Sequence, residues 1–213
     1  MADNRIDWLR ARKYGIGASE AACVLGLSPY KSNVELWEEK TGRREAPELS
    51  GNPRVDYGKR AEQHLRHLFE LDYPEYLIEY DEFGMVANLP DQPWLFATLD
   101  SALTHRENKR RGVLEIKTTE ISRPQQWEEW NDGVPQHYYI QVLHQLLATG
   151  YDFAVLKAQI KYRKDGELNL STRHYFFERC CLKDDLYFLL QAETTFWACV
   201  LDDRRPALIL PEI

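Results

Sequence analysis

Cysteine is scarce in this sequence, and the few cysteines present lack the spacing of a metal framework. Of the 213 residues four are cysteine, namely Cys23, Cys180, Cys181 and Cys199. None of them forms a Cys-x-x-Cys pair, so the sequence gives no indication of a zinc or iron–sulfur site. We therefore predict that the cysteines are reduced packing residues.

A long hydrophobic run is also missing. No segment approaches the roughly 20 apolar residues that span a bilayer. Residues 1–5 lack the basic and then apolar pattern of a secretory signal, and the sequence contains neither an internal repeat nor a low-complexity tract. These absences predict a cytoplasmic protein that has no membrane partner.

Excess positive charge is absent as well. Acidic residues outnumber basic ones by 34 to 27, and the net charge of −7 argues against indiscriminate binding of nucleic acid over the whole surface. A polyanion would have to be met by a local basic patch or through metal ions. The 44% hydrophobic and 29% charged residues are ordinary for a globular protein. No boundary divides the chain, so we predict a single domain over residues 1–213.

What the sequence does contain is a compact set of charges on two expected strands. Two apolar runs, 94–100 and 114–118, flank a polar, basic connection, which is a pattern typical of a hairpin. Side chains alternate along a strand, so Glu115 and Lys117 share one face, while Ile116 points to the other and leaves its carbonyl in the strand plane. Asp100 would lie on the neighbouring strand.

Carboxylates gathered in this way favour a hard divalent cation. Two carboxylates about 4 Å apart repel by roughly 4 kcal/mol at an effective dielectric constant of about 20, so Asp100 and Glu115 would require compensation. Mg²⁺ is typically held by one or two carboxylates together with waters and substrate phosphate oxygens. The plainer interpretation is that Glu115 and Lys117 form an ordinary ion pair on a half-exposed strand, and only the surrounding residues distinguish the two.

The remaining elements follow from periodicity. Helical periods predict helices over residues 5–14, 57–71, 135–150 and 184–201, and alternation predicts strands over 76–80, 83–89, 94–103, 112–118, 153–162 and 168–177. The four strands between residues 76 and 118 would form an antiparallel run. Residues 43–56 show no clear period and are predicted to form a loop.

Two of the predicted helices carry polar side chains of interest. Glu62 lies in the first turn of helix 57–71, where a glutamate also simply suits the helix dipole. On helix 135–150, His137, Gln141 and Gln145 recur every four residues and make one polar stripe. Because the other side of that helix is apolar, we expect the stripe to face a cleft.

A glycine-rich turn near the N-terminus offers a candidate anion site. In Gly15-Ile16-Gly17-Ala18-Ser19-Glu20, Ser19 is predicted to cap the following helix, and the glycines would let backbone amides approach an anion. Arg12 lies a short distance before this turn, so Arg12 and Ser19 together are suited to grip a phosphate. A plain N-cap beside a solvent-exposed arginine is the alternative.

Several motifs occur in a specific order between about residues 8 and 160. They are Arg12 with Gly15-Ile16-Gly17-Ala18-Ser19-Glu20, Leu25-Gly26-Leu27-Ser28-Pro29-Tyr30-Lys31-Ser32, Glu35-Leu36-Trp37-Glu38-Glu39-Lys40-Thr41-Gly42, Gly58-Lys59-Arg60-Ala61-Glu62, Asp100, Glu115-Ile116-Lys117, and Gln141-Val142-Leu143-His144-Gln145. Each motif alone is weak, whereas this succession resembles the YqaJ-like viral recombinase and lambda exonuclease family. One departure is Thr98-Leu99-Asp100-Ser101, where the family commonly has Ser-Pro-Asp-Gly.

The resemblance implies a restriction-endonuclease-like core of the PD-(D/E)xK superfamily, an α/β (α+β) fold with a mixed central sheet flanked by helices. It further implies a Mg²⁺-dependent exonuclease that digests one strand of linear double-stranded DNA from its 5′ end. Such enzymes release mononucleotides and leave 3′ overhangs. The alternatives are a structure-specific or nicking endonuclease of the same fold and, from another class, a non-catalytic DNA-end-binding subunit.

Site roles are implied position by position. Asp100, Glu115 and the Ile116 carbonyl would bind Mg²⁺, or Mn²⁺ in its place, and Glu62 would hold a metal-bound water at a second metal position. Lys117 would orient or deprotonate the attacking water, and Gln141 would position that water or Lys117. Arg12 and Ser19 would hold the 5′-terminal phosphate, and Val55 stands where the family places a strand-separating wedge.

The resemblance also implies partners. These are double-stranded DNA ends, a single-strand-annealing recombinase, and further copies of the chain in a ring-shaped trimer.

Overall fold

A five-stranded mixed sheet forms the centre of the molecule. The structure, a computed structural model, describes residues 2–47 and 51–210. The strands run in the order β2 (Tyr76–Glu79), β4 (Ser101–His105), β5 (Arg111–Ile121), β6 (Phe153–Lys164) and β7 (Glu167–Glu178). Only β5 and β6 are parallel, and the other neighbours are antiparallel. A second, two-stranded parallel sheet joins β1 (Ile16–Gly17) to β3 (Leu95–Phe96).

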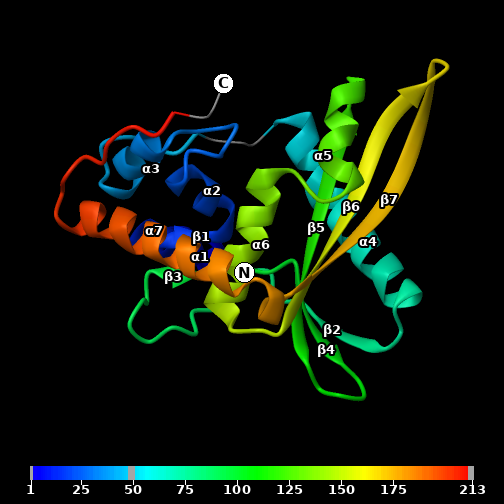
Figure 1. The fold of residues 1–213 in the computed structure, drawn as a ribbon, viewed down its shortest axis with the longest axis horizontal. Helices are drawn as coiled ribbons and strands as arrows, with labels where there is room; N and C mark the ends of the chain where they lie inside the picture. The colour runs from blue at the N-terminus through cyan, green and yellow to red at the C-terminus, as the bar shows by residue number, and fades with distance from the viewer. Residues whose placement is uncertain (1, 48–50, 211–213) are drawn as a thin grey trace.

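Helices flank both faces of the main sheet. The helices of the described residues are α1 (Ala2–Ala11), α2 (Ala21–Val24), α3 (Asn33–Lys40), α4 (Pro53–Asp72), α5 (Glu128–Asn131), α6 (Gln136–Thr149) and α7 (Lys183–Leu201). In Figure 1, α6 and α7 lie on one side of the long strands, and α4 lies on the other. The predicted α+β fold with a mixed central sheet flanked by helices is confirmed. Among the described residues, no helix has the length and apolar character needed to cross a membrane.

The first halves of the central strands β5 and β6 are buried on both faces, and the two faces belong to different cores. Val113 packs in the cluster under α6, whereas its neighbour Leu114 packs in the cluster under α4. The same alternation sends Ile116 toward α4 and Glu115 toward α6. Because parallel strands require a crossover connection, α5 and α6 lie between β5 and β6 in sequence and bring α6 onto the Glu115 face.

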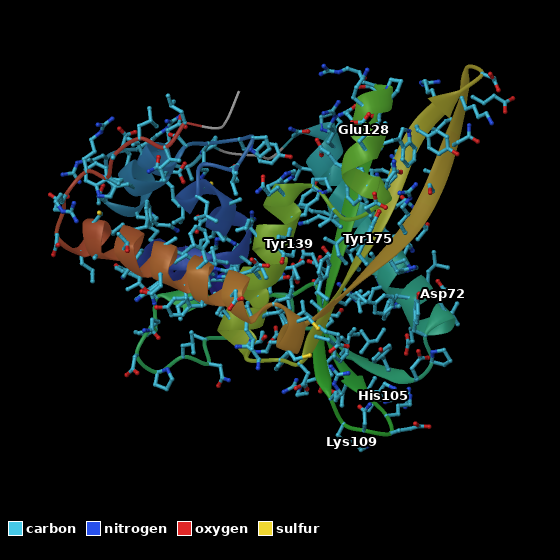
Figure 2. All side chains as sticks on the ribbon, viewed as in Figure 1. Asp72, His105, Lys109, Glu128, Tyr139 and Tyr175 are labelled. Carbon is cyan, nitrogen blue, oxygen red and sulfur yellow. The ribbon has the colours of Figure 1, made fainter. Side chains whose placement is uncertain are left out.

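Polar contacts inside the protein fix α6 against its neighbours. Tyr139 of α6, labelled in Figure 2, donates a hydrogen bond to Asp185 of α7 over 2.6 Å. His144 and Glu193 are fully buried, and Nδ1 of His144 lies 2.7 Å from the Glu193 carboxylate. Nε2 of the same ring lies 2.8 Å from the Phe96 carbonyl oxygen of β3. These contacts hold α6 in a fixed orientation over β5.

The predicted antiparallel run of four strands is wrong. Residues 83–89 form no strand and make only an isolated bridge between Val86 and Ala97. The predicted strand 94–103 is interrupted: β3 pairs in parallel with β1, and the chain bends at Thr98 to Asp100 before β4 begins. Asp100 therefore immediately precedes a strand rather than lying inside one.

Two local predictions in the N-terminal part of the chain also require correction. Ser19 is not an N-cap, because it lies inside a 3-10 turn, Ala18–Glu20, whose cap is Gly17. Helix α4 begins at Pro53 with Asn52 as its cap, so residues 53–56 are helical and do not belong to a loop. The glycine at position 15 serves packing against the neighbouring segment: a Cβ there would lie 2.1 Å from the Trp94 carbonyl oxygen, the acceptor for Ile16 N.

Gly15→Ala is accordingly expected to destabilise the protein. Overpacking of this kind costs about 1–3 kcal/mol, and here the obstacle is backbone that also carries the β1–β3 pairing. Denaturant unfolding should show a lowered midpoint with an unchanged slope. Gly133→Ala is the matched control, since a Cβ there meets no heavy atom of the described chain within 4 Å. Equal midpoints for the two variants would contradict the prediction.

Candidate active site

The end of β4 places Asp100 beside the middle of β5. The register pairs Ser101 with Leu114, so Asp100 stands opposite Glu115. Oδ2 of Asp100 accepts a hydrogen bond of 2.7 Å from Ile116 N. Because the N–H and C=O of one strand residue point to the same side, the Ile116 carbonyl also faces the space beyond the end of β4. It is thus free of the β5–β6 ladder and available to a ligand.

Glu115 is the most thoroughly buried acid of this group, with 2% of its surface exposed. Its Oε1 lies 2.6 Å from Lys117 Nζ and accepts a hydrogen bond of 2.6 Å from Gln141 Nε2. Its Oε2 accepts a hydrogen bond from Gln145 Nε2. A buried carboxylate is tolerated only when it is paired and hydrogen-bonded, and these donors meet that requirement. Gln145 had no predicted role, although its spacing of four residues from Gln141 was visible in the sequence.

Lys117 is an ammonium held between acids. Burial lowers the pKa of Lys117, but the nearby Glu115 and Asp100 carboxylates outweigh burial and raise the pKa above its ordinary value. The Nζ atom also lies 5.0 Å from the centre of the Tyr138 ring. In the metal-free site Lys117 is therefore charged, which suits a residue that positions water better than one that removes its proton.

Negative charge is in excess around Asp100. Burial, followed by the neighbouring Glu115 and Glu62 charges, raises the pKa of Asp100 well above its ordinary value. Burial also raises the pKa of Glu62, against the opposing influence of Arg66. Burial is the largest cause of both shifts, and neighbouring carboxylates add to it. A bound cation would oppose both causes.

Arg66 is a member of this group that sequence reasoning missed. Its Nη2 lies 2.5 Å from Oε1 of Glu62, one helical turn earlier on α4, and its Nε donates to the Asp100 carbonyl oxygen over 3.1 Å. The guanidinium also stacks 3.6 Å from the centre of the Tyr80 ring. Arg66 thus fixes Glu62 relative to Asp100. The spacing of four residues between Glu62 and Arg66 was the available indication.

The donor set fits a hard cation that keeps several waters. Within residues 2–47 and 51–210, no three His, Cys, Asp or Glu side chains gather closely enough to enclose a metal ion. Mg²⁺ does not need such a cage, because it is usually bound through one or two carboxylates plus water and phosphate oxygens. Asp100, Glu115 and the Ile116 carbonyl offer oxygen atoms of the kind that such a cation binds.

Arg12 and Ser19 do lie together, as predicted. Nη2 of Arg12 is 3.4 Å from the Ser19 hydroxyl and 3.9 Å from the Glu20 carboxylate, which binds Lys40 more closely at 2.7 Å. Arg12 also covers the Trp8 ring at 4.8 Å. Trp8 in turn donates a 2.9 Å hydrogen bond to the Thr98 hydroxyl, two residues before Asp100. Through Trp8, Arg12 is therefore connected to the segment that carries Asp100.

A cleft of about 720 Å³ opens beside Lys117. Its lining includes Val55 and Gly58 from the start of α4, Lys161 from β6, and His137 and Tyr138 from the first turn of α6. The predicted polar stripe of α6 therefore has two kinds of surroundings. His137 lines the cleft, whereas Gln141 and Gln145 contact the buried Glu115. Val55 is partly buried at the cleft wall, and its role as a wedge stays a prediction.

The profile of the YqaJ-like viral recombinase domain matches residues 7–152, which is most of the chain. The chain belongs to the YqaJ-like viral recombinase family. The predicted resemblance is confirmed. The uncharacterised YqaJ protein of Bacillus subtilis strain 168 is 28% identical over 208 residues. That match covers 96% of this chain but 59% of the relative, so the chain spans about three fifths of that protein's length.

Solved structures show that this YqaJ-like chain shares its fold with exonucleases. The alkaline exonuclease LHK-Exo of Laribacter hongkongensis superposes with a TM-score of 0.62 at 18% identity, over 92% of this chain and 93% of that one. LHK-Exo in complex with dAMP matches over the same shares with a TM-score of 0.62 at 19% identity. A phage-related exonuclease of Haemophilus somnus 129PT gives 0.59 at 14% identity, over 89% and 96%.

Proposed function

We propose that this YqaJ-like protein is a Mg²⁺-dependent exonuclease that acts on the ends of linear double-stranded DNA. The observation that carries the proposal is that Lys117, which lines the cleft, contacts the buried Glu115. Gln141 binds the same carboxylate, and Asp100 accepts a hydrogen bond from Ile116 N beside it. DNA phosphates would be repelled by these acids unless a cation lay between them. Family membership and the fold shared with alkaline exonucleases support the same chemistry and a PD-(D/E)xK core in one domain.

The residues divide the work of phosphodiester hydrolysis. Asp100, Glu115 and the Ile116 carbonyl would hold Mg²⁺, or Mn²⁺, and Glu62 would hold a metal-bound water at a second metal position. When bound, the two ions supply an activated water and stabilise the leaving oxygen of an in-line displacement. Lys117 donates to that water and keeps it in line with the phosphorus. Gln141 holds the Glu115 oxygen that Lys117 also contacts, so it orients both groups.

The polarity and products are part of the proposal. A 5′-terminal phosphate gripped by Arg12 and Ser19 would set the direction of digestion as 5′→3′, with mononucleotides released and a 3′ overhang left. LHK-Exo binds dAMP, a mononucleotide of the kind expected as product. Val55, at the cleft wall, would separate the strands. A single-strand-annealing recombinase would take the overhang, and a ring-shaped trimer would keep the duplex enclosed.

One gel assay tests the central claim. Linear duplex should be digested in Mg²⁺ and left intact in EDTA, and covalently closed circular duplex should survive in both, because an exonuclease requires an end. Cleavage of the closed circle would favour the structure-specific or nicking endonuclease. Intact linear DNA with tight end binding would favour a non-catalytic end-binding subunit. The buried acids argue against that last function, since a binding module gains nothing from acids beside phosphates.

Arg12→Ala is expected to remove the preference for a 5′ phosphate. The wild-type protein should digest 5′-phosphorylated duplex about tenfold faster than 5′-hydroxyl duplex, the effect of one charge-assisted contact of about 1.5 kcal/mol. The variant should digest both at one slow rate. Arg163→Ala, on the exposed end of β6, is the control. Equal wild-type rates on the two substrates would refute the roles of Arg12 and Ser19.

A further inference from the structure

Aromatic rings form a continuous wall from Lys117 to the rim of the cleft. The Tyr138 ring lies 5.0 Å from Lys117 Nζ, and its centre is 4.0 Å from that of His137. The His137 ring meets Tyr30 edge to face, with centres 6.0 Å apart and planes at 88°. All three side chains line the cleft. They come from two separate parts of the chain, since His137 and Tyr138 are neighbours on α6 and Tyr30 lies in the turn between α2 and α3.

The outermost ring of this wall is open to solvent. Tyr30 is 78% exposed, although it belongs to the family motif at residues 25–32 and follows Pro29. Its backbone N donates to the Ser28 hydroxyl over 3.2 Å, which fixes the turn. The exposed ring is therefore held at the cleft entrance by a constrained backbone and contributes little to the core.

The middle ring offers an unused polar atom. Nε2 of His137 is buried and has no hydrogen-bond partner among the described residues. Burial and the Lys117 charge lower the pKa of His137 to about 4, so the imidazole is neutral near pH 7. Buried polar atoms of native proteins nearly always have a partner. His137 lines the cleft, so a rotation of its ring would bring Nε2 within reach of a ligand there.

We propose that Tyr30 and His137 form a binding site for a nucleobase of the strand being digested. The base stacks on the exposed Tyr30 ring, and His137 Nε2 hydrogen-bonds to the base edge. Stacking suits an enzyme that must accept any sequence, because every base presents a π-face. The site would hold the nucleotide in register with Lys117. This inference rests on the proposed nuclease function and adds a base contact to it.

The test compares bases with abasic analogues. 5′-Phosphorylated duplexes would carry a tetrahydrofuran abasic residue at the first, second or third nucleotide, and kcat/KM would be measured for wild type and Tyr30→Ala. At one of these positions, loss of the base should cost the wild type about 5- to 150-fold, the range for one base–aromatic stack. Tyr30→Ala should show that loss on normal DNA and no further loss on abasic DNA.

Matched variants separate stacking from other effects. Tyr30→Trp should keep the wild-type ratio of kcat/KM between base-containing and abasic duplex. Tyr187→Ala on α7 removes a 67% exposed tyrosine outside the cleft lining and should behave as wild type. His137→Phe keeps a ring and removes Nε2, so it should lower kcat/KM on base-containing DNA and leave kcat/KM on abasic DNA unchanged. If abasic substitution affects wild type and Tyr30→Ala equally at every position, the site does not exist.

A binding measurement keeps this inference separate from the nuclease proposal. Duplex with 2-aminopurine at the sensitive position, mixed with protein in Ca²⁺ to prevent turnover, should lose fluorescence on stacking with wild type but not with Tyr30→Ala. Quenching by wild type alone, without digestion in Mg²⁺, would support the base-binding site and refute the nuclease function. Digestion with equal fluorescence in both proteins would overturn the base site alone.

Discussion

Lys117→Ala is expected to lower the turnover number by about 10²- to 10⁴-fold, the contribution of a well-placed proton-transfer or water-orienting group. Lys117 is the cation that contacts the Glu115 carboxylate directly, at 2.6 Å, and it borders the cleft. Its raised pKa keeps it charged, so the variant removes a donor to the attacking water. Glu115 retains Gln141 and Gln145 as hydrogen-bond donors but loses its charged partner, so the unfolding midpoint of the variant is measured beside its turnover to show that it is folded. Single-turnover digestion of linear duplex measures the effect.

A second lysine in the same cleft is the matched control for this experiment. Lys161 lines the cleft and packs on the Tyr57 ring, and no ion pair between it and an acid occurs among the described residues. Lys161→Ala should therefore weaken DNA binding in a salt-dependent way and change turnover little, as expected for a phosphate contact. Near-normal single-turnover rates for Lys117→Ala would refute the assigned role of Lys117. Similar losses in both lysine variants would show only that the cleft binds DNA.

Asp100→Asn should raise the stability of the metal-free protein and lower its activity. The amide oxygen can still accept from Ile116 N, so the shape of the site is kept while one negative charge is lost. Because burial and neighbouring acids raise the pKa of Asp100, the metal-free variant should be more stable than wild type. Digestion should fall by at least about 10²-fold, since one ligand of a catalytic metal is weakened.

Thermal unfolding with and without Mg²⁺ provides the direct measurement. At ten times its dissociation constant, Mg²⁺ should stabilise wild type by about 1.4 kcal/mol, and Asp100→Asn should show almost none of this. Asp185→Asn, at the Tyr139 contact between α6 and α7, should keep both the Mg²⁺ response and the activity. An undiminished Mg²⁺ response in Asp100→Asn would remove Asp100 from the metal site.

The charged group on β5 was predictable because strand geometry is strict. A period of two puts Glu115 and Lys117 on one face and Ile116 on the other in any extended chain, and the structure has this arrangement. The hairpin around Asp165 and Gly166 was predictable for a similar reason, since both residues adopt positive φ as a two-residue turn requires.

Errors occurred where a residue's partner is distant in sequence. Leu95 and Phe96 read as part of a long strand toward Asp100, but their pairing with Ile16 and Gly17 ends that strand early. Ser19 has the identity of a cap, yet the packing of Gly15 against Trp94 sets a different turn. Local propensity is a weak prior that such tertiary contacts override.

By itself, then, the sequence determined which chemical groups are present and which of them share a strand face or a helix stripe. Those relations follow from backbone periodicity and need no partner. The tertiary structure alone decided that Gln145 and Gln141 close over Glu115, that Arg66 joins Glu62 to Asp100, and that Tyr30 meets His137 at the cleft. Each of these contacts joins separate elements, and its distance depends on how α4, α6 and the α2–α3 turn pack against the sheet.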